Sequence, residues 1–167
     1  MADLQLTTIL ARNAWFFMWW PDPHLPDAIE AMRAAGFSFS AKAFTWIKTL
    51  PTLSRGSRLI STDEIEHMLA MGGGKTTRKN SESCWLGRRG NPQILSHGVR
   101  EVIVAPRREH SRKPDEFYAR VEAFCDGPRL DLFGRQSRPG WTVYGDEPTL
   151  FDRRAPPLPL IVPGRAA

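Results

Sequence analysis

The sequence predicts an α/β protein in which a mainly parallel sheet is flanked by helices. Uninterrupted apolar runs, of which residues 14–20 are the clearest, are typical of strands that are buried on both faces. Segments whose apolar residues recur three and four positions apart lie between these runs and predict helices. The alternation of the two patterns along the chain favours parallel strands joined by helical crossovers.

The size and charge of the chain agree with one soluble domain that binds a polyanion. Its 167 residues suffice for a sizeable core without metal or disulfide support, and 41% hydrophobic with 25% charged residues is ordinary for a globular protein. The formal net charge is +5, and residues 75–140 hold 14 of the 23 Lys and Arg residues and 8 of the 18 Asp and Glu residues. A basic middle of this kind suits a polyanionic partner.

Several common classes of protein are disfavoured. The start, Met-Ala-Asp, lacks the basic region of a signal peptide, and the apolar run at 14–20 is too short to cross a bilayer. Two isolated cysteines, Cys84 and Cys125, exclude a cysteine-based zinc site. Three histidines also lack the spacing of metal ligands, namely His24, His67 and His97. We therefore expect a cytoplasmic protein with no metal and no membrane partner.

The first part of the chain predicts a helix, a strand and a second helix. Residues 4–10 fit a short helix, and the apolar run at 14–20 is the first strand. Pro26 and Asp27 open the second helix, since proline suits a first helical position and a carboxylate complements the positive helix end. Gly36 ends this helix.

The next segment predicts one strand and then loses its regularity. Aromatic and small residues alternate over residues 37–48, which favours a strand. Ser61 and Glu64 match a capping box and predict a third, short helix. Three glycines at 72–74 precede a lysine but lack the spacing of a phosphate-binding loop, so a flexible hinge is the preferred interpretation.

The second half of the chain predicts one more helix and four strands, at residues 82–88, 99–106, 129–134 and 141–144. The helix begins at Pro114, whose missing N–H would be unpaired at a helix start in any case. Phe117, Val121 and Phe124 recur on one face of this helix, and Gly127 can end it. The predicted elements thus alternate as an α/β sheet requires.

The segment at residues 107–116 is the one around which these elements are organised. It follows an apolar strand and leads into a helix, and ligands bind at that place in open α/β sheets. It contains four cations before the helix, Arg107, Arg108, Arg112 and Lys113. Taken alone, a solvated charged turn is an equally good interpretation.

Four motifs that follow one another along the chain favour a ligand site over a solvated turn. They are Lys113-Pro114-Asp115-Glu116, Leu132-Phe133-Gly134-Arg135, Arg138-Pro139-Gly140-Trp141 and Gly145-Asp146-Glu147. In this order they resemble the MT-A70 family, the S-adenosylmethionine-dependent adenine-N6 methyltransferases that act on DNA or RNA. The likeness covers roughly residues 3–147, and four ordered motifs are a specific signal. It implies a partial, Rossmann-like methyltransferase domain over residues 1–148. The prolines of residues 149–167 predict a disordered tail after it.

The resemblance also implies where S-adenosylmethionine binds. The family holds this cofactor with a lysine, a Phe-Gly-Arg strand end and a Gly-Asn-(Gln/Glu) turn, which match Lys113, Phe133, Arg135, Asp146 and Glu147. A lysine at a helix start can reach the methionine carboxylate, and a phenylalanine offers a flat face to adenine. Acidic side chains can accept hydrogen bonds from the ribose. Asp146 departs from the asparagine of the family and lacks its donor.

Two further segments resemble the substrate side of the family. Trp46-Ile47-Lys48 is similar to its Trp-Val-Lys strand end, and residues 77–84 are similar to its Thr-Arg-x-Asn-x-Glu-x-Cys segment. In the family, strand-end tryptophans stack on the target base, the glutamate contacts it, and basic loops hold the phosphates. Each tryptophan could equally be a core residue, which is the preferred interpretation for Trp15 and Trp20. The implied substrate-binding residues are Trp19, Trp46, Lys48, Arg78, Glu82, Arg107, Arg108, His110 and Ser111.

One motif of the family is missing. Its Asp-Pro-Pro-aromatic tetrapeptide aims the target amine, and no such tetrapeptide occurs among the 167 residues. Asp22-Pro23-His24 is a poor substitute because it follows the next strand and lacks the second proline. The resemblance therefore predicts a chain that is short by one N-terminal strand, and it assigns no catalytic residue. The sheet would then have an exposed edge for a partner to cover, in a homodimer or a heterodimer.

Two functions follow from these patterns. The leading hypothesis is methyl transfer to adenine N6 in DNA, with RNA the less favoured substrate. The alternative is a non-catalytic paralogue or subunit that binds nucleic acid and supports an active methyltransferase. A hydrolase that uses Glu109 and His110 has little support, because no nucleophile or orienting group is positioned with them.

Overall fold

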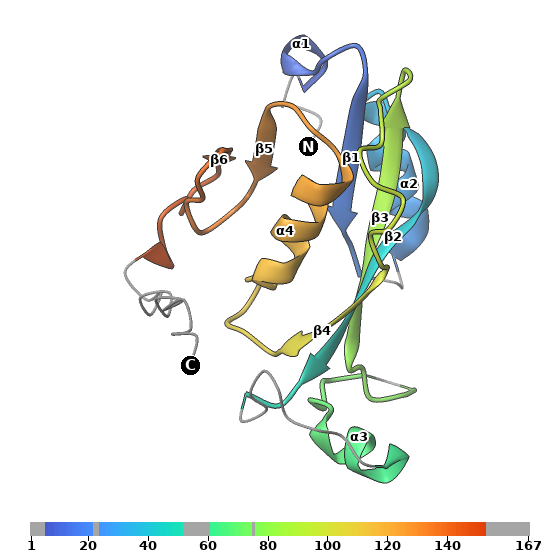
Figure 1. Ribbon diagram of the computed structural model, residues 1–167, viewed down its shortest axis with the longest axis vertical. Coiled ribbons are helices and arrows are strands. Elements are labelled where there is room, and N and C mark those ends of the chain that lie inside the picture. Colours follow the sequence, from blue (N-terminus) through green and yellow to red (C-terminus); the bar gives the residue numbers. More distant parts are fainter. Residues whose placement is uncertain (1–5, 22–23, 52–60, 75, 153–167) are drawn as a thin grey trace, which may run out of the picture. The chain divides into compact units, whose positions relative to one another are not determined.

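A computed structural model of the chain describes residues 6–21, 24–51, 61–74 and 76–152 (Figure 1). The chain divides into two compact units, Met1–Asp126 and Gly127–Ala167. Each unit has its own sheet, and we take the two units separately. None of the helices in the described ranges has the length and apolar character needed to span a bilayer.

The first unit contains, in its described residues, one four-stranded sheet and four helices. In chain order these elements are α1 (Leu6–Ile9), β1 (Ala14–Trp19), α2 (Leu25–Ala34), β2 (Ser38–Thr49), α3 (Thr62–Met68), β3 (Ser81–Arg89), β4 (Val102–Pro106) and α4 (Asp115–Phe124). Most of them lie within a few residues of the segments that the sequence predicts. The mixed α/β class is therefore confirmed.

The sheet of the first unit is mixed, so the expectation of a mainly parallel, Rossmann-like sheet is not confirmed. Its strand order is β1-β3-β2-β4. The central strand β3 is antiparallel to both of its neighbours, β1 and β2, whereas β2 and β4 are parallel. It follows that β1, β2 and β4 run in one direction and that β3 alone runs in the other.

The connection between β2 and β3 explains this difference. Two described residues of this connection lie beside the end of β2, because Ala70 donates its N–H to the carbonyl of Lys48 and Lys48 donates its N–H to the carbonyl of Asn80. The helix of this connection, α3, has its predicted capping box at Ser61 and Glu64 but buries no side chain. A crossover helix must cover the sheet with an apolar face, and α3 does not, so β3 returns antiparallel.

Two helices cover opposite faces of β1. Phe16 stacks on Phe37, and both lie against Gly87 on the side where α2 buries Met32. The next residue, Phe17, points to the other face, where its ring meets Phe117 of α4. A strand covered on both faces needs apolar residues at successive positions, which accounts for the uninterrupted run in the sequence.

The second unit is built around a parallel strand pair, β5 (Arg129–Leu132) and β6 (Trp141–Tyr144). Both strands lie within the segments that the sequence predicts. The chain beyond β6 packs back onto this unit, since Phe151 is buried and its N–H donates to the carbonyl of Arg135 at 2.9 Å. The predicted disordered tail begins at residue 149, and residues 149–152 belong to this folded unit. Residues 153–167 lie outside the described ranges.

Candidate functional site

The direction of the strands brings several predicted site residues to one edge of the first sheet. β1, β2 and β4 end at this edge and β3 begins there, because Trp19 pairs with Cys84, Ile47 with Ser81, and Lys48 with Ala105. Side chains from the last residues of β1, β2 and β4 and from the first residues of β3 therefore meet at this edge. This edge is where ligands bind in open α/β sheets.

A glutamate that lies between two lysines is the centre of this edge, and we name it the Lys–Glu–Lys cluster (Lys48, Glu82 and Lys113). The Nζ atom of Lys48 lies 2.6 Å from Oε1 of Glu82, and the Nζ atom of Lys113 lies 2.7 Å from Oε2. Burial alone would raise the pKa of Glu82, but the charges and hydrogen bonds of Lys113 and Lys48 outweigh burial and lower it. The glutamate is therefore ionised at neutral pH, and the cluster carries a net charge of +1.

Each lysine of the cluster also lies over a tryptophan ring. The Nζ atom of Lys113 is 5.3 Å from the centroid of Trp19, and that of Lys48 is 5.1 Å from the centroid of Trp46. Both distances fall within the range of a cation–π interaction. Together with these two tryptophans, the cluster joins β1, β2, β3 and the segment before α4, and all five residues are among those that the sequence implicates.

The two tryptophans differ in accessibility. Trp46 is only 3% exposed, and its indole N–H donates to the carbonyl of Ala105 at 2.9 Å. This ring is therefore a support between β2 and β4, and stacking on a base would require it to leave the core. Trp19 is half-buried, and its Nε1 atom has no hydrogen-bond partner among the described residues. Trp19 is consequently the tryptophan that a ligand at this edge could reach.

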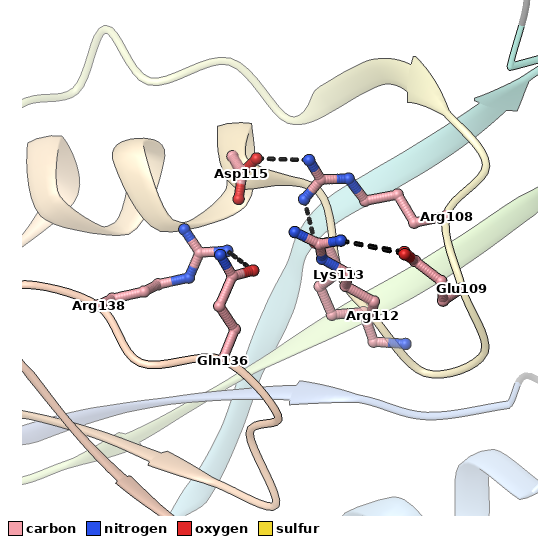
Figure 2. Close-up of polar contacts among 7 residues, drawn as sticks. All are labelled: Arg108, Glu109, Arg112, Lys113, Asp115, Gln136 and Arg138. Carbon is pink, nitrogen blue, oxygen red and sulfur yellow. Dashed lines mark hydrogen bonds and ion pairs between the residues drawn. The ribbon is translucent and has the colours of Figure 1, made fainter. Parts of the chain in front are cut away.

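The charged segment at residues 107–113 is ordered by internal ion pairs, which Figure 2 shows. Arg108 lies 2.6 Å from the carboxylate of Asp115, and Arg112 lies 3.1 Å from that of Glu109. A hydrogen bond from its own backbone and the neighbouring Arg112 lower the pKa of Glu109. The segment is therefore more than the solvated charged turn that the sequence left open.

A cavity of about 480 Å³ opens beside this segment. It lies at the ends of β2 and β4 and at the start of α4, and it is lined by Pro51, Ala105, Pro106, Arg107, Arg108, Glu109, Pro114, Asp115 and Glu116. Thr49 ties it to β2, since its carbonyl accepts the N–H of Arg107 at 2.9 Å. Sequence reasoning missed Thr49 and Pro51 at this cavity, because their position there depends on the pairing of β2 with β4.

Three other predicted substrate residues lie outside the Lys–Glu–Lys cluster. Arg78 is exposed on the segment before β3. The Nδ1 atom of His110 lies 3.0 Å from Oγ of Ser111, and both residues are exposed. This contact resembles a base beside a nucleophile. No carboxylate within the described ranges orients the histidine, so the hydrolase hypothesis gains no third group.

The second unit brings together most of the predicted cofactor residues. Phe133 follows β5 with a φ of 63° and is 57% exposed, and its N–H donates to the carbonyl of Tyr144 at the end of β6. Nearby, the Nε atom of Arg135 lies 3.5 Å from a carboxylate oxygen of Glu147. Asp146 is exposed on the same turn. These side chains offer an apolar face and carboxylate acceptors, which are the groups that a nucleoside needs.

In the described parts of the chain, no group of three or more His, Cys, Asp or Glu side chains is placed to hold a metal ion. Cys84 is fully buried in β3, and burial raises the pKa of its thiol. The candidate site is therefore built from ammonium, carboxylate and aromatic groups.

Comparison with known proteins decides the family. The family model described as MT-A70 matches residues 1–147 of this chain. The chain belongs to the MT-A70 family. The resemblance drawn from the sequence motifs is therefore confirmed, and the matched residues include the Lys–Glu–Lys cluster and both strands of the second unit.

Named relatives of this MT-A70 chain are all methyltransferases. The N(6)-adenosine-methyltransferase catalytic subunit METTL3 of Homo sapiens is 30% identical over 143 residues, which are 83% of this chain and 22% of the human protein. The MT-A70-like protein of Drosophila melanogaster is 36% identical over 142 residues, 83% of this chain and 21% of the relative. The Type II methyltransferase M.MunI of Mycoplasma sp is 25% identical over 151 residues, 88% of this chain and 56% of the relative. The chain thus spans between about a fifth and about half of the length of these proteins.

Proposed function

We propose that this chain provides the catalytic-domain scaffold of an S-adenosylmethionine-dependent methyltransferase that acts on adenine N6 in nucleic acid, with DNA as the substrate. The observation that carries the proposal is the Lys–Glu–Lys cluster at the carboxyl edge of the sheet, in a chain that matches the MT-A70 family over residues 1–147. The cluster provides a fixed carboxylate and two ammonium groups at the place where ligands bind in open α/β sheets.

The proposed cofactor residues fit S-adenosylmethionine by their chemistry. Lys113 has the ammonium group for the methionine carboxylate, Phe133 the exposed face for adenine, and Asp146 and Glu147 the acceptors for ribose hydroxyls. Arg135 is paired with Glu147 and would hold that carboxylate in place. When bound, the cofactor supplies a methyl group on a positively charged sulfur, and the protein residues bind and orient it.

On the substrate side, the ionised Glu82 is the group best suited to the target amine. A carboxylate can accept a hydrogen bond from the N6 amino group and so orient its lone pair. Lys48 and Lys113 hold the two carboxylate oxygens at 2.6 and 2.7 Å, which fixes the direction in which Glu82 accepts. The base must leave its stack to reach this edge, and the half-buried Trp19 is the ring that could replace the lost stacking.

A second candidate function is a nucleic-acid-binding module without catalysis. One observation favours it: the positive charge is concentrated in the middle of the chain, where residues 75–140 hold 14 of the 23 Lys and Arg residues. Such a module would keep the basic segment and the aromatic strand ends and would support an active partner. Salt-sensitive binding of nucleic acid without binding of the cofactor would then be expected.

Calorimetric titration of the full chain with S-adenosylmethionine separates the two candidates. For the methyltransferase, we expect binding that weakens about tenfold or more in Lys113→Met, since a charge-assisted hydrogen bond contributes about 1.5–3 kcal/mol. Lys42→Met is the matched control, because Lys42 lies on β2 but pairs with the exposed Glu101. Thermal melting of each variant shows whether the fold is kept.

Radiolabelled methyl transfer to adenine-containing duplex DNA and to RNA of the same sequence completes the experiment. Transfer to DNA alone supports the proposal in full, and transfer to RNA alone contradicts the choice of substrate. If the chain binds nucleic acid but neither binds the cofactor nor transfers methyl, the non-catalytic module replaces the methyltransferase. A chain that binds neither ligand would contradict both candidates.

A further inference from the structure

Arginines gather at the end of the first sheet that lies opposite the Lys–Glu–Lys cluster. β1 and β2 begin there and β3 ends there, because Ala14 pairs with Arg89 and Ser38 pairs with Arg88. Arg12 precedes β1 by two residues. We name this group the arginine edge (Arg12, Arg88 and Arg89). It lies apart from the candidate site, since β3 begins beside the cluster and ends with these arginines.

Two backbone contacts hold Arg12 beside the end of β3. The side-chain oxygen of Asn13 accepts the N–H of Asn91 at 2.9 Å. Gly90 has a φ of 63°, and a Cβ atom on it would lie 2.6 Å from the carbonyl oxygen of Arg12. Only glycine fits such a close approach at a positive φ. The sequence therefore fixes Arg12 next to Arg89.

The positive charge of the arginine edge is not neutralised by its own strands. None of its three guanidinium groups forms an ion pair with a carboxylate in the part of the chain that the structure describes. The segments that meet at this end of the sheet contain no Asp or Glu, and they are residues 9–15, 33–40 and 85–99. They add a fourth arginine, Arg33, which is exposed in the last turn of α2.

The end of α4 is the neighbouring element that brings carboxylates. It reaches this end of the sheet, because the ring of Phe124 packs edge-on against Trp15 with 5.2 Å between the centroids. Glu122 and Asp126 lie on either side of Phe124 in the sequence. Four arginines against these two carboxylates leave a net charge of +2, so the region favours an anionic partner.

Arg89 gives a second indication of a ligand. Its side chain is half-buried, and the Nη1 atom is buried without a hydrogen-bond partner among the described residues. Buried polar groups in folded proteins nearly always have a partner, so an orphaned donor of this kind needs an explanation. An anion at the arginine edge would supply the missing acceptor. Arg12 and Arg88 are exposed beside it and can contact the same polyanion.

We propose that the arginine edge is a second contact surface for the nucleic acid, at which Arg12, Arg88 and Arg89 contact backbone phosphates away from the target adenine. The inference rests on the proposed function, and it extends the substrate beyond the candidate site. Guanidinium groups suit phosphates because two parallel N–H donors match two phosphate oxygens. Contacts of this kind carry no sequence information, and they hold a duplex in register while a base is read elsewhere.

The length of β3 sets the distance between the two contact regions. Glu82 and Arg88 are six positions apart on this strand, which corresponds to about 20 Å at roughly 3.3 Å per residue. Successive nucleotides of one strand of a duplex are about 3.4 Å apart along its axis, so the contacted phosphates lie about six base pairs from the target adenine. The proposal therefore predicts a minimum length of flanking duplex.

Fluorescence anisotropy of the full chain with a duplex of about 24 base pairs, measured over a series of salt concentrations, tests the proposal. Each phosphate contact contributes about one to the slope of log affinity against log salt, so Arg12→Gln/Arg88→Gln lowers the slope by about two. Both side chains are exposed, and the melting temperature of this variant stays at that of the wild type. Lys42→Gln/Arg100→Gln is the matched control, because it removes two exposed cations near Glu101 in the same unit and leaves the slope unchanged. A control that loses as much slope overturns the proposal, since the effect would then come from net charge alone.

A charge-preserving variant and a shorter duplex sharpen the test. Arg12→Lys/Arg88→Lys keeps both charges, and its slope stays close to that of the wild type. If it loses as much slope as the glutamine variant, the loss comes from an altered fold and the proposal is overturned. A duplex of about eight base pairs with the target adenine at its centre is too short to reach the arginine edge, so the glutamine variant changes its slope by less than one. An equal loss of slope on both duplexes overturns the proposed position of the contact.

The outcomes for the inference and for the proposed function are distinct. Wild-type protein that binds no duplex overturns the nucleic-acid substrate itself. Wild-type protein that binds, with a slope unchanged in Arg12→Gln/Arg88→Gln and in the control alike, overturns only the role of the arginine edge. Titration with polyglutamate is the last arm. Polyglutamate binding that needs Arg12 and Arg88, together with an unchanged duplex slope, would assign the arginine edge to an acidic protein segment and overturn the inference.

Discussion

The Lys–Glu–Lys cluster of the first unit and the turn around Phe133 in the second unit are built on opposite principles. In the cluster two lysines share one carboxylate at 2.6 and 2.7 Å, and the three side chains are between 21% and 35% exposed. Around Phe133 the ion pair of Arg135 with Glu147 spans 3.5 Å between more exposed groups, and the aromatic ring itself is 57% exposed. The first region is complete within the protein, whereas the second leaves its most apolar group in solvent.

The backbone strengthens this contrast. Phe133 has a φ of 63°, a conformation that costs a residue with a side chain roughly 1–2 kcal/mol relative to the right-handed region. No burial of the ring offsets this cost, because the ring is largely exposed. A strained, exposed aromatic residue at a strand end is therefore better explained by a bound ligand than by the stability of the unit, and this is the argument for its role in the proposed cofactor site.

The largest expected effect breaks the first region. Glu82→Gln removes the charge that holds two half-buried lysines, and we expect it to lower the free energy of unfolding by about 1–2 kcal/mol. Denaturant unfolding near neutral pH measures the difference. Glu101→Gln is the control, because it breaks a longer and more exposed pair with Lys42, and its effect stays below about 1 kcal/mol.

The pH dependence of the same variant sharpens the comparison. The folded protein lowers the pKa of Glu82 below its ordinary value of 4.5, so this carboxylate stabilises the fold above pH 4.5 and loses that effect as pH falls through the folded pKa. The difference in unfolding free energy between wild type and Glu82→Gln should therefore shrink below pH 4.5. A difference that stays constant down to pH 3 would show that the ion pairs do not stabilise the cluster.

A smaller effect of opposite sign is expected in the second region. Phe133→Gly removes the strain of a positive φ and a ring that buries little, so the unfolding free energy should be unchanged or rise by up to about 1 kcal/mol. Binding of S-adenosylmethionine, measured by calorimetry, should be lost if the ring holds the adenine of the cofactor. Phe133→Gly protein that is less stable by more than 1 kcal/mol would show that the ring supports the fold instead.

The sequence predicted the separate elements better than their arrangement. The apolar run of β1, the capping box of α3 and the proline before α4 are local signals, and the corresponding elements lie close to where they were expected. The direction of β3 is not a local property, because it depends on α3 leaving the sheet uncovered and on Lys48 pairing with Asn80. A strand antiparallel to its neighbours therefore had no signal in the alternation of helices and strands.

The candidate site shows the same division. The family motifs assign Lys113 to the cofactor, and Lys48 and Glu82 to the substrate. The structure joins the three side chains in one cluster. For Trp46 the sequence leaves a base-stacking position and a core position open, and its buried indole N–H donates to the carbonyl of Ala105. Such partners come from strand register, which places residues 59 positions apart in contact.

The smallest expected effect concerns the ion pair of the second region. Arg135→Met removes a 3.5 Å contact between side chains that are 36% and 50% exposed, and pairs of this kind contribute about 0.5 kcal/mol or less to unfolding. We therefore expect a change in melting temperature close to the error of the measurement, and a larger loss in cofactor affinity because Glu147 is no longer held toward the ribose. Arg129→Met, on β5 of the same unit, is the control for cofactor affinity. If Arg135→Met destabilises the protein as much as Glu82→Gln does, the two regions do not differ in the way their distances indicate, and the second would also be held together by its charges.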